Sequence, residues 1–206
     1  MSDYLESVGS AQRFRIEGAL DARAGRGSAH DEYSGDLIAH YAGAYPIWVF
    51  LEVVEFGALV DLWRYCSERW SEQSMRDEHY VLKSVKALRN ACAHNSLIVN
   101  GFTSTAANTR YQVSRSIAIS LAEKGIPKTK SRRAKLKNLR VAQIAATLYS
   151  VNAFCELDTT RMRHARRMGD VQSYAKGCGV LSRANDGIVS FFDFLWKMVD
   201  IWLPVE

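Results

Sequence analysis

Apolar residues recur at three- and four-residue spacing along most of the chain, which is the period of an amphipathic helix. Long runs of Ala, Leu, Arg and Glu, interrupted by only three prolines, leave few candidates for strands. We therefore predict an all-α fold. The expected helices span residues 3–23, 30–43, 46–69, 77–93, 110–124, 131–155, 158–178 and 182–202.

The segment 77–93 has two faces of different chemistry. One face is expected to point into the core and carries Val81, Leu82, Val85, Leu88 and Cys92. The opposite face carries His79, Lys83, Lys86, Asn90 and His94. Arg89 projects between the faces, about 140° from His94 on an ideal helix, and Asn95 is expected to end the helix. Arg89 and His94 could therefore share a ligand only if His94 swings at the helix end, or if a second copy of the motif completes the site.

Arg89, Asn90 and His94 provide the groups that cleave a phosphodiester without a metal. An imidazole can move a proton near neutral pH, and a guanidinium can hold the charge that builds up on a phosphoryl oxygen. The amide can position a phosphate oxygen. The alternative interpretation is that the basic face is only solvated and that His94 is a capping residue, because cations are favoured at helix C-termini.

Two carboxylates interrupt the apolar segment 46–69. Glu52 and Glu55 fall within about 60° of one another on a helix, so the pattern predicts that they share a face. Burying them would require a cation, and Arg89 is the first candidate. Glu52 would then orient Arg89, or the ion pair would only fix the helix register. Acid–base catalysis by the two carboxylates, as in a glycosidase, is disfavoured because an apolar helix provides no cleft.

The length of 206 residues and a hydrophobic content of 48% suit one domain spanning 1–206, or two lobes that share its core. We expect no membrane span, because the longest apolar stretch, 42–60, contains two glutamates. The scattered cysteines have no metal-ligand spacing and are expected to be buried thiols of a reduced cytosol: Cys66, Cys92, Cys155 and Cys178. A cytoplasmic protein without a metal or other cofactor is therefore expected.

Basic residues are concentrated in the C-terminal half, although the formal net charge is only +5. Residues 124–155 contain basic but no acidic side chains, and a second basic cluster occupies 161–167. This concentration favours contact with a polyanion such as RNA, whereas the alternative is a solvated surface that aids solubility. No RNA-reading motif or phosphate-binding glycine loop is present. The expected RNA contacts are Lys83, Lys86, Lys128, Lys130, Arg132, Arg133, Lys135, Lys137, Arg140, Arg163, Arg166 and Arg167.

Two spaced blocks resemble a known family. An Arg followed by Asn, with His five positions after the Arg, resembles the motif of the HEPN superfamily of α-helical ribonucleases and RNA-binding proteins. The blocks Tyr45-Pro46-Ile47-Trp48, Glu52, Phe56-Gly57, Leu88-Arg89-Asn90 and Ala93-His94-Asn95 resemble AbiD/AbiF-type abortive infection proteins. The similarity covers residues 37–102 well and the C-terminal part, 110–206, loosely. Asn95 stands where the family often has a second His.

The resemblance implies a HEPN-fold, RNA-binding protein of antiviral defence or of a toxin–antitoxin system. It further implies a metal-independent endoribonuclease that leaves 2′,3′-cyclic phosphates, with Arg89, Asn90 and His94 as catalytic residues and Glu52 holding Arg89. The superfamily is usually dimeric, and a homodimer would supply a second His. Two alternatives remain: a non-catalytic module that holds a regulatory or antitoxin RNA, and a protein-interaction partner in a toxin–antitoxin pair.

Overall fold

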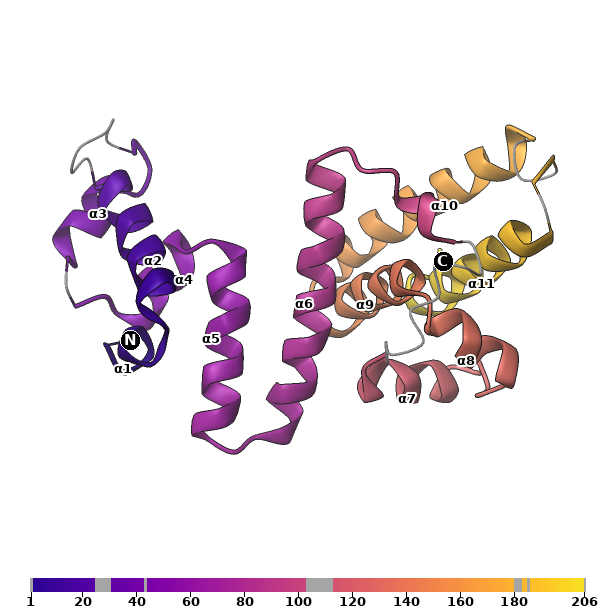
Figure 1. Cartoon of the computed structure of the whole chain (residues 1–206). Coiled ribbons are helices and arrows are strands. Elements are labelled where there is room, and N and C mark those ends of the chain that lie inside the picture. The colour runs from indigo at the N-terminus through magenta and orange to yellow at the C-terminus, as the bar shows by residue number, and fades with distance from the viewer. Residues whose placement is uncertain are drawn as a thin grey trace. The chain divides into compact units, whose positions relative to one another are not determined.

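The computed structural model describes residues 2–24, 31–42, 44–102, 113–179, 183–184 and 186–205. These residues form helices and no strand, which confirms the predicted all-α fold (Figure 1). The chain divides into two compact units, Met1–Arg76 and Asp77–Glu206. Each unit has its own hydrophobic core. The division does not test whether the chain folds as one domain, so that expectation stays a prediction.

The first unit consists of short helices around a small core. Its helices are α1 (Ser2–Ser7), α2 (Ser10–Arg23), α3 (Gly35–His40), α4 (Ile47–Val53) and α5 (Phe56–Arg69). Tyr4, Ile38 and Phe50 are almost fully buried at the centre of this core. The Tyr4 hydroxyl donates a hydrogen bond to the Ala58 carbonyl (3.2 Å), and burial raises the pKa of Tyr4 to about 12. The aromatic side chain of Tyr4 thereby ties the N-terminal helix to α5.

The expected helix 46–69 is interrupted at Val54 and Glu55, where the backbone is extended with ψ of 147° and 144°. Glu52 therefore belongs to α4, whereas Glu55 is the N-cap residue of α5. Both carboxylates are exposed. The prediction that they share one face of an apolar helix is wrong. The consecutive valines before Glu55 favour extended backbone, and exposure removes the desolvation penalty that a continuous helix would have imposed.

Other helices are also shorter than expected. Residues 3–23 are divided at Gly9, and residues 131–155 are divided at Asn138. The Asn138 side chain accepts hydrogen bonds from the backbone N–H groups of Arg140 (3.0 Å) and Val141 (3.2 Å), so it starts a new helix as an N-cap. The expected helix 30–43 is reduced to α3. Parts of the expected helices 30–43, 110–124 and 182–202 lie outside the described residues.

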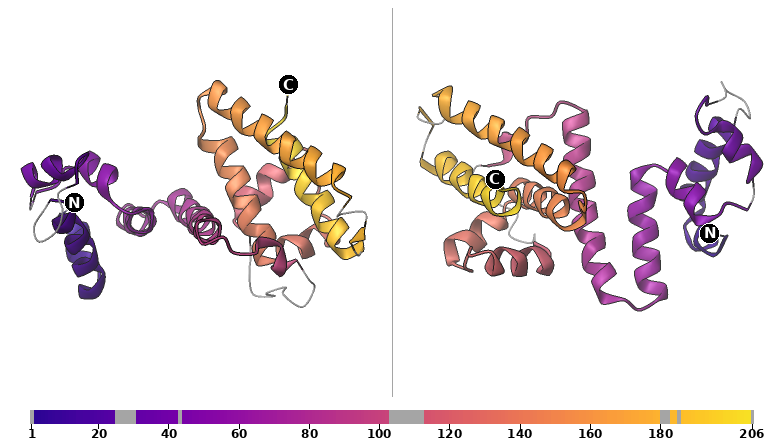
Figure 2. Two further views of the ribbon diagram at one scale, coloured as in Figure 1. Left: turned by 90° about the horizontal axis from the view of Figure 1, so that it is seen from above. Right: turned by 180° about the vertical axis from the view of Figure 1, so that it is seen from behind.

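The second unit is built around two long helices that pack along one another. These are α9 (Leu139–Phe154) and α11 (Asp186–Trp202), with α10 (Asp158–Gly177) against α11 (Figure 2). Around them lie α6 (Gln73–Ala93), which begins in the first unit, the 3-10 helix η1 (Ile98–Gly101), α7 (Arg115–Glu123) and α8 (Lys130–Leu136). None of the described helices is long and apolar enough to cross a membrane.

Candidate functional site

A C-capping motif at the end of α6 fixes the position of His94. Asn95 has a left-handed backbone with φ of 50°. Its N–H donates to the Cys92 carbonyl (3.0 Å), and the Ser96 N–H donates to the Ala91 carbonyl (2.8 Å). These two bonds form a Schellman motif in which His94 is the final, half-helical residue. Asn adopts left-handed backbone more readily than most residues, which suits it to position 95.

Arg89, Asn90 and His94 lie on the last two turns of α6. Arg89 and His94 are exposed, and Asn90 is half-buried. The Arg89 Nη1 atom donates a hydrogen bond to Asn90 Oδ1 (3.2 Å), which leaves the amide nitrogen of Asn90 as a donor for a ligand. Within the described part of the chain, no hydrogen bond or ion pair joins Arg89 to His94. The structure thus brings Arg89 and Asn90 together and leaves His94 separate.

The apolar face predicted for α6 is correct except at its C-terminal end. Val81 and Leu88 are buried, whereas Leu82 and Val85 are half-buried. Cys92 is exposed, because the core of the second unit receives α6 through Val81 and Val85 and the last turn lies beyond it. His79 was expected on the polar face but is only 7% exposed, and its ring packs edge-on against Tyr80.

The expectation that all four cysteines are buried is also wrong. Cys66 and Cys155 are half-buried, and Cys92 and Cys178 are exposed. Cys155 and Cys178 are C-cap residues of α9 and α10, where the chain leaves the core. Among the described residues, no three His, Cys, Asp or Glu side chains form a group that could hold a metal ion.

A pocket of about 670 Å³ lies between α6, α7 and α9. Lys83 of α6, Arg115 of α7 and Gln143 of α9 line it, and Arg140 donates a hydrogen bond to Gln143 (3.0 Å). His94 lies eleven positions after Lys83, which places both within about 20° on one face of α6 and about 16 Å apart along its axis. The pocket therefore continues the basic face of α6 away from the candidate catalytic residues.

One wall of this pocket is held by Asp77. Its carboxylate accepts hydrogen bonds from the Ser114 hydroxyl (2.7 Å), the Ser116 hydroxyl and the backbone N–H of Ser116 (2.9 Å) and Arg115 (3.3 Å). Burial of Asp77 opposes its ionisation, but the hydrogen bonds from Ser116, Ser114 and Arg115 outweigh this effect and lower its pKa. Asp77 of α6 thus caps the N-terminus of α7 across 37 residues of sequence. The sequence near Ser114 indicates the start of a helix. The carboxylate of Asp77, which accepts the hydrogen bond of Ser114, could not be predicted from the sequence.

The predicted RNA contacts near α8 differ in their surroundings. Lys128, Lys130, Arg133 and Lys137 are exposed, whereas Arg132 and Arg140 are half-buried. The Lys135 ammonium instead donates to the Ser190 carbonyl (2.6 Å) and hydroxyl (2.7 Å), and it lies 5.7 Å from the centre of the Phe194 ring. Desolvation lowers the pKa of Lys135. Lys135 therefore attaches α8 to α11, and its ammonium group already donates hydrogen bonds within the protein.

A second basic surface lies on α10. Arg163, Arg166 and Arg167 are exposed and follow at steps of three and one, so they form one stripe on the helix. Arg161 points elsewhere, since it donates a hydrogen bond to the Cys155 carbonyl (3.0 Å). On α6, Lys83 is exposed and Lys86 is half-buried. The stripe on α10 is the most regular group of cations among the predicted contacts.

The expected ion pair between Glu52 and Arg89 joins residues of the two different units. Glu52 is exposed in the first unit, and Arg89 is exposed in the second. The pairing therefore stays a prediction. What the structure settles is that Glu52 does not need a cation to compensate burial.

Comparison with known proteins adds a relationship for the N-terminal part of the chain. No curated protein and no solved structure matches the chain. Residues 9–100 match the model of a family described as Abi-like protein. The matched region includes Glu52, Arg89, Asn90 and His94 and ends before the basic residues of segment 124–155. The match supports an abortive-infection family, as the resemblance of the sequence blocks implies.

Proposed function

We propose that this chain is a cytoplasmic abortive-infection protein of the AbiD/AbiF type, with a HEPN fold, that binds RNA and cleaves it without a metal. The observation that carries the proposal is the end of α6. His94 is exposed there as the C-cap residue of a Schellman motif, and the exposed Arg89 is hydrogen-bonded to Asn90 in the preceding helical turn. These residues lie inside the region that matches the Abi-like family.

In the proposed reaction, the ribose 2′-oxygen attacks the adjacent phosphorus. His94 takes the proton of the 2′-hydroxyl while the bond between the 2′-oxygen and phosphorus forms. Arg89 holds the negative charge of the crowded phosphorane, and Asn90 positions one phosphate oxygen. The bond from phosphorus to the 5′-oxygen then breaks, and this oxygen takes a proton from an acid. The products are a 2′,3′-cyclic phosphate and a 5′-hydroxyl.

The two proton transfers require two groups, and His94 is one. A homodimer that brings two copies of the motif together would supply the second imidazole, and it would also let Arg89 of one subunit act with His94 of the other. This arrangement answers the angular gap of about 140° between the two side chains on one helix. Glu52 is proposed to orient Arg89 in the assembled site.

A second candidate function is RNA binding without cleavage, for example holding a dedicated non-coding RNA. The specific observation in its favour is the exposed stripe of Arg163, Arg166 and Arg167, which can contact phosphates independently of His94. In that case Arg89, Asn90 and His94 at the end of α6 would contact RNA or stabilise the helix end, without taking part in cleavage.

The deciding experiment is incubation of purified protein with structured and single-stranded RNAs in the presence of EDTA. Wild-type protein should produce fragments with cyclic phosphate ends. His94→Ala should reduce the rate by about 10²–10⁴, which is the usual contribution of one acid–base group. His40→Ala is a matched control, because His40 is also an exposed histidine at a helix end. It should leave the rate unchanged.

Each outcome separates the two candidates. Loss of cleavage with retained RNA binding in His94→Ala supports catalysis by His94. RNA that is bound but intact with wild-type protein supports the non-catalytic function. Equal loss of rate in both histidine variants would contradict a specific role for His94.

A further inference from the structure

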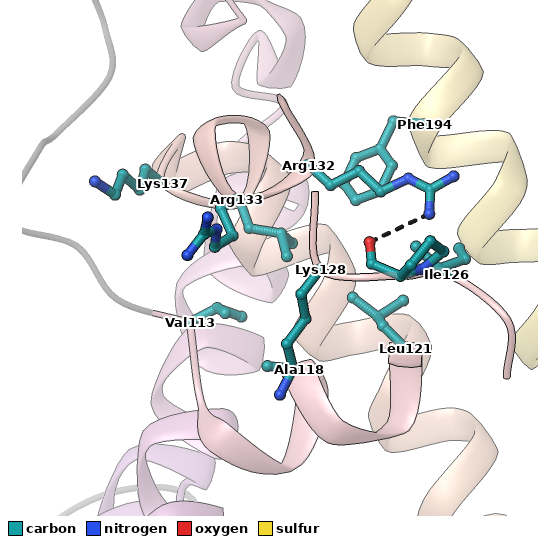
Figure 3. Close-up of a pocket in the computed structure, with 11 residues that line it drawn as sticks. Val113, Ala118, Leu121, Ile126, Lys128, Arg132, Arg133, Lys137 and Phe194 are labelled. Carbon is teal, nitrogen blue, oxygen red and sulfur yellow. Dashed lines mark hydrogen bonds between the residues drawn. The ribbon is translucent and has the colours of Figure 1, made fainter. Parts of the chain in front are cut away.

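A second pocket, of about 350 Å³, opens between α7, α8 and α11 (Figure 3). Its inner wall is formed by Leu121, Ile126, Leu136 and Phe194, each at most 8% exposed. All four belong to the hydrophobic core of the second unit. The pocket therefore exposes part of this core to a ligand, and its volume lies in the range of small-molecule sites.

The turn after α7 shapes this inner wall. Gly125 has φ of +84°, a backbone conformation that residues other than glycine rarely adopt. The Gly125 N–H donates to the Ala122 carbonyl (3.2 Å), and the Ile126 N–H donates to the Leu121 carbonyl (2.8 Å). In this Schellman motif Ile126 is brought back against Leu121, which closes the apolar wall.

The outer part of the pocket is cationic. Lys128, Arg132, Arg133 and Lys137 line it, and none of its lining residues in the described part of the chain is acidic. Arg132 donates a hydrogen bond to the Pro127 carbonyl (3.3 Å), drawn as the dashed line in Figure 3, which holds its guanidinium at the segment that follows α7. Cationic side chains lining one pocket give it a positive potential, which favours an anionic ligand.

We propose that this pocket binds an amphipathic anion, with an aliphatic chain against the inner wall and a carboxylate or phosphate among the outer cations. The division of the pocket into an apolar inner wall and a cationic rim matches the two ends of such a molecule. A nucleobase fits less well, because it would leave its polar ring atoms without partners against an apolar wall, and the Pro127 carbonyl already accepts from Arg132. The proposal is independent of RNA cleavage.

The test is calorimetric titration of the full chain without RNA. Decanoate and decyl phosphate, below their micelle concentrations, supply the tail with either headgroup. Decanol supplies the tail alone, and acetate and inorganic phosphate supply the charge alone. At least one amphipathic anion should bind at least tenfold more tightly than all three partial ligands, and the tighter of the two identifies the headgroup. Binding of decanol as tight as that of decanoate, or no binding of either anion, would overturn the proposal.

Matched variants locate the site. Arg132→Gln with Arg133→Gln removes two rim charges and should weaken binding at least tenfold. Lys124→Gln with Lys130→Gln removes two exposed charges nearby that do not line the pocket, and it should leave binding unchanged. Equal weakening by the two double variants would overturn the assignment to this pocket.

A neutral variant separates this proposal from RNA contact. Ala118 lines the pocket from α7, so Ala118→Trp should fill it and abolish anion binding without changing any charge. RNA binding by the basic surfaces should persist in this variant. Circular dichroism and melting temperature establish whether each variant is folded. If Ala118→Trp does not fold, the comparison of the two double variants tests the proposal. Tight decanoate binding by a folded Ala118→Trp variant would contradict the proposal.

Discussion

The backbone conformation of a single residue, Asn95, fixes the position of His94 at the end of α6. The left-handed conformation that ends α6 costs a side-chain-bearing residue roughly 1–2 kcal/mol, and Asn pays less than most. The left-handed backbone at position 95 thus favours Asn over most other side-chain-bearing residues.

We predict that Asn95→Ala lowers the free energy of unfolding by about 1 kcal/mol and also reduces RNA cleavage, because the α6 cap is weakened. Asn95→Gly should keep both close to wild type, since glycine adopts left-handed backbone without a steric penalty. Urea denaturation and cleavage assays on the same preparations check this. Equal destabilisation by the two substitutions would show that the backbone conformation is not the cause.

A second prediction concerns Asp77. Asp77→Ala should lower the free energy of unfolding by about 1–3 kcal/mol, because hydrogen-bond donors at the start of α7 lose their acceptor. The pKa of Asp77 is lowered in the folded state, so this stabilisation is complete above the ordinary pKa of 3.8 and is lost as the pH falls through the folded value. The difference between wild type and Asp77→Ala should therefore shrink in acid.

Denaturation at neutral and acidic pH measures this difference, with Asp170→Ala as the control. Asp170 is exposed on α10, so its loss should change the stability little at either pH. A difference between wild type and Asp77→Ala that grows as the pH falls would contradict the assigned role of the carboxylate.

At the scale of elements, hydrophobic periodicity identified the long helices α6, α10 and α11 to within about four residues, whereas it merged α8 and α9 into one expected helix, 131–155. The breaks inside expected helices were harder to predict. Asn138 is a recognisable N-cap residue, so the start of α9 could have been read from the sequence. The interruption at Val54 and Glu55 follows only weakly from valine propensity, and the cap of α7 by Asp77 depends on tertiary packing. Local signals therefore predict elements, whereas contacts between distant elements decide their ends.

The same limit applies to the candidate contacts. The charge of Lys135 is visible in the sequence, but its hydrogen bonds to Ser190 on α11 are not. Burial of His79 and exposure of Cys92 likewise depend on where the core meets α6. Residue type indicated the chemistry of these positions, and packing decided which of them remain available to a ligand.

For the basic surface of α10, we predict that Arg163→Gln, Arg166→Gln and Arg167→Gln together weaken RNA binding and reduce its salt dependence. If each arginine contacts one phosphate of a single strand, the slope of log affinity against log salt should fall by about 2, or 0.7 per contact. Filter binding at several salt concentrations measures the slope.

The control for this prediction replaces three exposed arginines of the first unit, Arg13, Arg15 and Arg64, by glutamine. Arg13 and Arg64 already pair with Glu17 and Glu68 (both 2.8 Å), so their charges are locally compensated. The control should leave the slope unchanged. The same fall in both triple variants would mean that RNA responds only to net charge.

At the scale of the whole molecule, the family match and the basic surfaces occupy different parts of the chain. The match at residues 9–100 includes most of the first unit and all of α6, whereas α8 and α10 follow it. The proposed catalytic residues and most of the proposed RNA contacts therefore come from separate regions of sequence. This separation explains why the two can be tested independently, by His94→Ala and by the α10 variants.

The homodimer is the proposal that belongs to the whole molecule. Light scattering should give twice the mass of the 206-residue chain at working concentration. If Arg89 of one subunit acts with His94 of the other, Arg89→Ala and His94→Ala chains are each inactive alone. A mixture refolded together should regain at most about a quarter of wild-type activity, because half of the dimers are mixed and each mixed dimer keeps one Arg89–His94 pair across the subunits but only one of the two imidazoles. Activity of the mixture above that of either variant alone supports a site shared between subunits, whereas a strict monomer with RNA present would contradict it.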